Sequence, residues 1–360
     1  MTDHDAELVT DIERLLADYL DRAGAPYRSV EPFADALDAL SAFVLGGGKR
    51  LRPTFAWWAW RGAGGAAAGP EADAALHAAA ALELLQACAL IHDDLMDASD
   101  SRRGAPTVHV AFAKQHAEYG WHGQPERFGL AAAVLIGDVA LAWADDMFGS
   151  TPLPAAVIAA ARPTWQAMRT EVLAGQYLDV HTQATGDTSP GAAMRVNELK
   201  TAAYTVARPL ELGARLAGAD EDLIASLRLF GRDIGIAFQL RDDLLGVFGD
   251  PAVTGKPAGD DLREGKRTLL AALGLQRARE AGRHQDEEAI AAAIGDAGLS
   301  GEQLERARDA LTGVGAVDAV ERQIVELTEE ALTVLGNAAL AEPGKRKLTE
   351  LAHAATKRTS

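Results

Sequence analysis

The chain has 360 residues, of which 48% are apolar and 6% aromatic, so it can bury a large core and is too hydrophobic for a disordered chain. Its formal net charge of −17 argues against a nucleic-acid surface, which needs basic patches. Cys88 is the only cysteine, which excludes an intrachain disulfide and a cysteine-built zinc site. The N-terminus is polar and acidic, and no apolar run of ~18 residues is free of charge, so we expect a cytoplasmic protein without a membrane-spanning helix.

Apolar residues recur at three- and four-residue spacings while β-branched alternation is nearly absent, so the predicted elements are helices. In chain order they cover residues 5–23, 29–46, 50–62, 71–98, 106–118, 128–148, 154–183, 193–217, 221–248, 267–281, 284–295, 301–313, 315–341 and 343–357. Segments rich in helix-breaking residues separate them at 61–70, 119–126, 184–191 and 249–266. None resembles a long flexible linker, so one all-α domain is favoured over two.

The Gly-rich segment 46–53 (Gly-Gly-Gly-Lys-Arg-Leu-Arg-Pro) opens onto the third predicted helix. It is not a phosphate-binding loop of the Walker type, because the leading glycine and the Ser or Thr after the lysine are missing. As a turn before a helix it can hold an anion with backbone N–H groups, Lys49 and Arg52, which lie three apart on one face. A basic helix cap is the alternative.

The predicted helix 71–98 ends in an acidic cluster. Asp93 and Asp97 are four residues apart, hence on one helical face and about 6 Å apart along the axis, where both can bind the same magnesium ions. Asp94 points roughly 100° away, so we expect it to be a supporting group. Arg102 and Arg103 follow, and their guanidinium groups suit bidentate phosphate contact. The alternative is a helix end with solvated acids, which the apolar residues before Asp93 disfavour.

A second acidic cluster, with Gln239, Asp242 and Asp243 on adjoining faces, lies in the predicted helix 221–248. A Gly-rich loop after it carries two further acids and two lysines: Lys256, Asp260, Asp261 and Lys266. Such lysines can supply point charges to a diphosphate, although a loop lysine is usually just solvated. We expect the two acidic clusters to be facing walls of one cavity. In the helix 154–183, Gln176 and Asp179 could line that cavity.

Taken in order, the segment 47–53, Asp-Asp-Leu-Met-Asp at 93–97 with Arg-Arg-Gly at 102–104, Lys200-Thr201, and Phe-Gln-Leu-Arg-Asp-Asp at 238–243 with Gly255-Lys256 and Lys266-Arg267-Thr268 resemble the trans-isoprenyl diphosphate synthases. The likeness runs from about residue 40 to 270. It implies one isoprenoid synthase domain over 1–360, a single large all-α bundle around a central cavity that helices 267–357 complete. It also implies a homodimer.

The resemblance further implies roles for individual residues. The magnesium ligands would be Asp93, Asp97 and Asp242, with Asp261 acting through water. The isopentenyl diphosphate site would comprise Lys49, Arg52, Gln86 and Arg103. The allylic diphosphate site would comprise Arg102, Lys200, Thr201, Gln239, Lys256 and Lys266. Catalysis would rest on Asp93, Asp97, Asp242, Lys200, Thr201 and Gln239. Gly246 departs from the pattern, since some members have an aspartate at that place.

The implied reaction is the Mg²⁺-dependent head-to-tail (1′-4) condensation of isopentenyl diphosphate with an allylic diphosphate. Product length depends on how deep the apolar bore runs below Asp93. Ala89 and Cys88 lie one turn deeper, about 5.4 Å or roughly one isoprene unit. Synthases that stop at fifteen carbons commonly have aromatic residues there, so two small residues predict geranylgeranyl diphosphate, with longer chains or farnesyl diphosphate as alternatives.

Other classes of protein share parts of this pattern. A terpene cyclase has the fold but normally lacks the Gly-Gly-Lys-Arg segment and the second acidic pair. A metal-dependent phosphohydrolase could use His92 and Asp93, but it would need further histidines, and none has suitable spacing. A regulatory subunit of a heteromeric synthase tends to lose one acidic motif, and this chain keeps both. A purely structural bundle has no need of paired acids beside paired arginines.

Overall fold

Helices make up nearly all the regular structure of this computed structural model, which describes residues 3–250 and 258–357. Over those residues the only strands are β1 (Ser101–Arg102) and β2 (Ala105–Pro106), so the predicted all-α class is confirmed. The chain divides into two units, one made of Met1–Trp165 with Pro209–Asp220 and the other of Gln166–Arg208 with Glu221–Ser360. That they form one domain around a central cavity stays a prediction.

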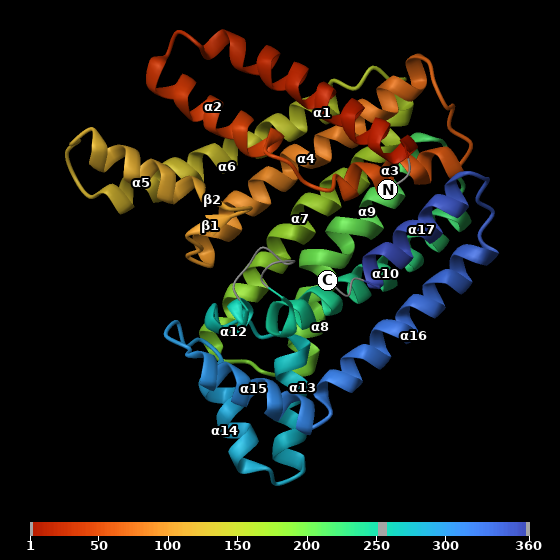
Figure 1. The fold of residues 1–360 in the computed structure, drawn as a ribbon. Helices are drawn as coiled ribbons and strands as arrows, with labels where there is room; N and C mark the ends of the chain where they lie inside the picture. The colour runs from red at the N-terminus through yellow and green to blue at the C-terminus, as the bar shows by residue number, and fades with distance from the viewer. Residues whose placement is uncertain (1–2, 251–257, 358–360) are drawn as a thin grey trace. The chain divides into compact units, whose positions relative to one another are not determined.

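The first unit contains the N-terminal helices and most of one later helix. They are α1 (Asp3–Gly24), the short 3₁₀ turn η1 (Ala25–Tyr27), α2 (Glu31–Leu45), α3 (Leu51–Gly62), α4 (Pro70–Met96), α5 (Val108–Glu118), α6 (Pro125–Gly149), the start of α7 (Ala155–Thr185) and most of α9 (Arg208–Leu216). Figure 1 shows α5 and α6 as a helical hairpin, with α6 beside α4. The helix predictions agree with these elements to within a few residues.

Helix α4 is the buried centre of the first unit. Pro70 begins it, and Glu71 and Asp73 in its first turn complement the positive end of the helix dipole. Alanine and leucine fill it on all sides, as expected of a helix without a solvent face, and most of its residues from Ala72 to Ile91 are buried. The acidic cluster therefore ends a rigid core element.

A two-stranded hairpin after α4 was not predicted. Strand β1 pairs with β2 so that Ser101 lies opposite Pro106 and Arg102 opposite Ala105. Arg103 and Gly104 between them have φ values of 54° and 76°, and positive φ at both central residues is what a type I′ turn requires. Strands of two residues are too short for any alternation of apolar and polar residues to reveal them.

The second unit contains the remaining helices. They are the rest of α7, α8 (Pro190–Val196), the π-helix η2 (Asn197–Ala207), α10 (Glu221–Phe248), α12 (Asp260–Arg263), α13 (Leu269–Glu280), α14 (His284–Ala293), α15 (Gly301–Gly313), α16 (Ala316–Asn337) and α17 (Gly344–Thr356). Apolar residues of α10, α13, α15 and α16 form its core. Figure 1 shows α14 and α15 as a hairpin.

The segment predicted as one helix over 193–217 is in fact three successive elements, α8, η2 and α9. Its middle part η2 is a π-helix of 11 residues that carries Lys200 and Thr201. A π-helix is bonded from residue i to i+5 where an α-helix is bonded from i to i+4, and over 11 residues this small change of period is not visible in the sequence pattern. Such widened turns are frequent at functional sites.

Candidate active site

The Gly-rich segment between α2 and α3 has an unusual backbone. Gly47, Gly48 and Arg50 all have positive φ, at 92°, 136° and 48°. This backbone leaves Lys49 exposed, while Arg52 lies half-buried in the first turn of α3. Arg103 Nη1 donates to the carbonyl oxygen of Gly47. The structure thus brings Arg103 to the segment that carries Lys49, and three cations of the predicted isopentenyl site belong to neighbouring segments.

The three acids at the end of α4 have different environments. The Asp94 side chain is 1% exposed and accepts two hydrogen bonds from Arg102 Nε, at 2.8 and 2.9 Å. Arg102 Nη2 lies 3.4 Å from Asp93 Oδ2, and Asp93 and Asp97 are both half-buried. Burial raises the pKa of Asp94, and the hydrogen bond from Arg102 opposes that rise. Asp94 therefore holds Arg102 beside Asp93, while Asp93 and Asp97 keep access to solvent.

The two residues predicted to set product length lie one turn below Asp93. Ala89 shares the face of Asp93 and Asp97 and is partly exposed. Cys88 is buried, with its Sγ 3.7 Å from His92 Nδ1, and His92 Nε2 lies 3.3 Å from the carbonyl oxygen of Val134 on α6. Ala89 is thus the residue on the acidic face, and Cys88 lies on the face towards α6.

In the second unit the π-helix η2 positions two predicted site residues. Lys200 Nζ lies 2.5 Å from Asp179 Oδ2 on α7. Thr201 Oγ1 donates to Gln239 Oε1 (2.6 Å), and Gln239 Nε2 donates to Asp243 Oδ1 (2.7 Å). The structure therefore links Lys200 to α7 and Thr201 to α10, and it gives Asp179 the defined role of partner to Lys200.

The second acidic pair is divided in the same way as the first. Asp242 is exposed, whereas Asp243 is buried. Burial raises the pKa of Asp243 to about 8, and the negative charge of Asp261 adds to the rise. Lys266 Nζ lies 2.6 Å from Glu264 Oε2 and 3.5 Å from Asp261 Oδ1. The predicted residues Gln239, Asp242, Asp261 and Lys266 therefore lie on α10 and on the segment around α12, whereas Lys256 lies outside the described residues.

Two charged residues near the site were not singled out from the sequence. Arg50 and Glu83 are buried and bonded to each other. The signal for Glu83 was available, because it is the one acid within the long Ala/Leu run of α4. No comparable signal distinguished Arg50 from its basic neighbours Lys49 and Arg52.

The acidic groups fit magnesium. Asp93 and Asp97 offer two carboxylates one turn apart at the end of α4. Within the described part of the chain no group of three acidic, His or Cys side chains forms a complete site. Magnesium usually binds one or two carboxylates and completes its sphere with phosphate oxygens and water, so this sparse donor set suits it.

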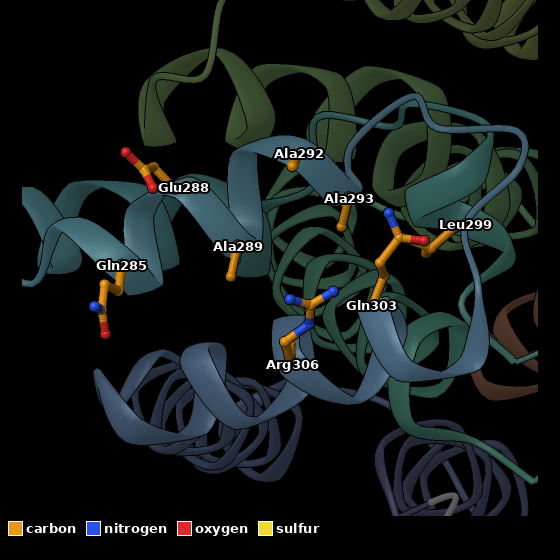
Figure 2. A pocket seen from close by; sticks show the side chains of 8 residues that line it. All are labelled: Gln285, Glu288, Ala289, Ala292, Ala293, Leu299, Gln303 and Arg306. Atoms are coloured by element: carbon orange, nitrogen blue, oxygen red, sulfur yellow. The ribbon is translucent and has the colours of Figure 1, made fainter.

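A pocket elsewhere in the second unit does not contain these residues. It lies between α14 and α15, has a volume of about 410 Å³, and is lined by alanines with Gln285, Glu288, Leu299, Gln303 and Arg306. Figure 2 shows that these side chains come from α14, from α15 and from the segment between them. With one carboxylate and one guanidinium it lacks the paired acids and clustered cations of the candidate site.

Comparison with known proteins identifies the family of this chain. A family model described as polyprenyl synthetase matches residues 35–305. The chain is 46% identical to geranylgeranyl pyrophosphate synthase from Corynebacterium glutamicum, and the crystal structure of that protein complexed with isoprenyl diphosphate and magnesium matches 98% of this chain and 99% of its own with a TM-score of 0.93. Geranylfarnesyl diphosphate synthase of Aeropyrum pernix is 33% identical over 325 residues, 84% of this chain and 94% of that protein. A (2E,6E)-farnesyl diphosphate synthase of Mycobacterium tuberculosis is 36% identical over 236 residues, 66% of this chain and 59% of that protein. The chain therefore belongs to the polyprenyl synthetase family of trans-isoprenyl diphosphate synthases and is a prenyltransferase.

Proposed function

We propose that this prenyltransferase condenses isopentenyl diphosphate with an allylic diphosphate, 1′ to 4, and releases geranylgeranyl diphosphate. The observation that carries the proposal is the hydrogen bond from Arg103 to Gly47. It brings a cation of the β1–β2 hairpin to the Gly-rich segment, which carries further cations. A terpene cyclase binds a single diphosphate and needs no such second group of cations. A synthase needs it to hold isopentenyl diphosphate.

The cations around Gly47 would bind and orient the isopentenyl diphosphate. Exposed Lys49 supplies a mobile point charge, and Arg52 and Arg103 supply planar donor groups that match phosphate oxygens. Gln86, half-buried on α4 two turns before Asp93, would add an amide donor. Together they would fix the homoallylic double bond in one orientation, which lowers the entropic part of the barrier.

On the allylic side, the C1–O bond breaks and diphosphate leaves with the electron pair. Magnesium bound to Asp93, Asp97 and Asp242 would neutralise the charge that grows on this leaving group. Arg102, Lys200 and Lys266 add preorganised positive charge, held in place by Asp94, Asp179 and Asp261. The isopentenyl double bond then attacks C1, and the proton lost from its C2 passes to the departing diphosphate. No protein base is needed.

The product assignment rests on the small residues below Asp93. Neither Ala89 nor Cys88 places a ring in the path of a growing chain. The match in fold and sequence to the geranylgeranyl pyrophosphate synthase of Corynebacterium glutamicum supports twenty carbons. The similarity to a geranylfarnesyl and a farnesyl diphosphate synthase marks the two neighbouring outcomes.

The decisive experiment is a product-length assay of the purified protein. It is incubated with isopentenyl diphosphate, Mg²⁺ and dimethylallyl, geranyl or farnesyl diphosphate in turn. We expect geranylgeranyl diphosphate from all three primers, and EDTA should abolish the coupling until Mg²⁺ is restored. If only farnesyl diphosphate forms from the two shorter primers, the prediction that Ala89 and Cys88 leave room for a longer chain is wrong. If no coupling occurs with any primer, the proposed reaction is wrong.

A phosphohydrolase centred on His92 and Asp93 is not favoured by the geometry. His92 points to Cys88 and to the carbonyl oxygen of Val134 on α6, while Asp93 lies beside Arg102. The imidazole and the carboxylate thus have different neighbours. Release of inorganic phosphate, without prenyl coupling, would be the result that revives this reading.

We also propose that the protein acts in the cytoplasm as a homodimer, in which the two copies contact each other through α6. By length and hydropathy both α4 and α6 could cross a membrane, but 78% of the relevant stretch of α4 is buried, against 33% for α6. Leu130, Val134 and Leu135 form an exposed apolar face on α6. In a two-fold dimer one such face would cover its copy.

A further inference from the structure

Arg50 is clamped inside the first unit. Its side chain is 2% exposed, although its neighbour Lys49 is exposed to solvent. Arg50 Nη1 donates to Glu83 Oε2 (2.8 Å), and Nη2 donates to the carbonyl oxygen of Val44 (2.8 Å) and to Glu13 Oε1 (3.3 Å). The guanidinium therefore ties the Gly-rich segment to α1, α2 and α4 at once.

The backbone of Arg50 is held as firmly as its side chain. Arg50 adopts φ 48°, a left-handed conformation that non-glycine residues adopt only under constraint. Its carbonyl oxygen accepts from Thr54 Oγ1 (2.7 Å) and from the Thr54 backbone N–H (3.1 Å). Lys49 and Arg52 flank this fixed residue, so their directions follow from it.

Glu83 connects the clamp to the rest of the predicted isopentenyl site. It is a buried acid near the middle of α4, 6% exposed, and Gln86 follows it by three residues on the same helix. A buried charge without a partner is strongly unfavourable, so Arg50 and Glu83 hold each other in place. The ion pair therefore joins the Gly-rich segment directly to α4.

We propose that Arg50 and Glu83 are positioning residues that set the isopentenyl diphosphate subsite. They do not touch substrate; they fix Lys49 and Arg52 on one side and Gln86 on the other. Arg103 reaches the same segment through Gly47. The inference rests on the proposed function, because it names which of the two substrates depends on the pair.

Substitution of both partners separates positioning from folding. Glu83→Gln removes the buried carboxylate that pairs with Arg50 and leaves only the 40% exposed Glu13 at 3.3 Å, so it should lower the melting temperature and raise KM for isopentenyl diphosphate. In Arg50→Met/Glu83→Leu the buried pair is replaced by apolar side chains, which often restores stability. The 40% exposed Glu13 side chain can then be solvated.

The double variant should regain its melting temperature but keep a raised KM for isopentenyl diphosphate. We expect an increase of about tenfold to a hundredfold, the range seen when a residue that orients a metal ligand is removed. The KM for the allylic substrate should stay within about twofold of the wild type, because that substrate does not use this segment. Arg50→Lys keeps the positive charge but loses the planar guanidinium with its several donors. Its KM for isopentenyl diphosphate should therefore lie between those of the wild type and the double variant.

Glu211→Gln is the matched control. Glu211 is a buried acid of the same unit that bonds Arg215 and Thr164, so its loss should lower the melting temperature and leave both KM values unchanged. A double variant with wild-type stability and wild-type KM for isopentenyl diphosphate would overturn the inference. Calorimetric titration with isopentenyl diphosphate alone gives the same comparison without turnover. It would still test the pair if the wild-type protein failed to couple its substrates.

Discussion

The pairs Asp93-Asp94 and Asp242-Asp243 each contain one buried carboxylate and one with more exposure. Asp94 and Asp243 are buried and bonded to Arg102 and Gln239, whereas Asp93 and Asp242 keep more exposure. Two adjacent residues on a helix point about 100° apart, so one carboxylate can anchor a neighbour while the other meets solvent. Replacing Asp93 or Asp242 by an uncharged residue should therefore weaken metal binding. The same replacement at Asp94 or Asp243 should lower stability.

Ala89 offers a test of product length at a single residue. Ala89→Phe places a ring one turn below Asp93 on the acidic face, so the main product should shorten to fifteen carbons or fewer. Cys88→Phe should shorten it too, but Cys88 is packed against His92, and overpacking there should also cost about 1–3 kcal/mol of stability. Chromatography of the dephosphorylated products measures the length, and thermal melts measure the stability. An unchanged product from both variants would place the end of the bore elsewhere, for instance on α7.

Gly246 is the departure from the family pattern, and the structure supplies a reason for it. A Cβ at this position would lie 1.8 Å from Asp261 Oδ2, so only glycine lets this carboxylate approach α10 closely. Gly246→Ala should turn Asp261 away, destabilise the protein by about 1 kcal/mol and raise the Mg²⁺ concentration needed for half-maximal rate. Adding Asp261→Ala should then have little further effect on the metal dependence.

Gly336→Ala is a suitable comparison, because a Cβ there meets no neighbour within 4 Å. It should be neutral or stabilising by up to ~1 kcal/mol, with an unchanged Mg²⁺ dependence. If Gly246→Ala behaved like this control while Asp261→Ala impaired activity, the close approach would have no functional role.

At the scale of elements, the π-helix η2 is packed tightly between two helices through glycines. A Cβ on Gly175 of α7 would lie 2.4 Å from the Lys200 backbone nitrogen, and one on Gly235 of α10 would lie 2.5 Å from Ala202 Cα. Gly175→Ala must push η2 away, and backbone cannot yield as a side chain does. We expect a cost of about 1–3 kcal/mol and a raised KM for the allylic substrate, with KM for isopentenyl diphosphate unchanged. Steady-state kinetics with each substrate varied in turn gives both values; equal changes in the two KM values would contradict this assignment.

The elements that periodicity could predict are those that bury one face or all faces. Helices such as α4 and α10 follow from their apolar spacing and from the Gly- and Pro-rich breaks around them. The β1–β2 hairpin, η2 and α12 escaped, because each is too short or too irregular for a period to appear. The residue types at the site followed from motif and resemblance. The Arg50–Glu83 clamp needed the structure, since only tertiary contacts distinguish a buried arginine from two exposed or half-buried basic neighbours.

For the whole molecule, the exposed apolar face of α6 predicts the oligomeric state. Leu135 is 64% exposed, and Leu130 and Val134 beside it are also exposed. Leu135→Arg puts a charge at the centre of this face, so the dimer should dissociate while the isolated chain keeps its helical content. Light scattering coupled to size-exclusion chromatography measures the mass. Glu126→Arg, in the first turn of the same helix and nine residues before Leu135, is the control, and a dimer that survives Leu135→Arg would rule out α6 as its contact.

The reactivity of the single cysteine can report how often α4 and α6 separate. Burial raises the pKa of Cys88 to about 12, with Asp138 adding to the rise, so the side chain is a buried neutral thiol near neutral pH. An alkylating reagent can therefore react at an appreciable speed only when α4 and α6 part and expose the sulfur. The mass of the intact protein during alkylation gives the rate at which Cys88 becomes exposed. A slower rate with a diphosphate present would show that the substrate reduces the separation of α4 and α6.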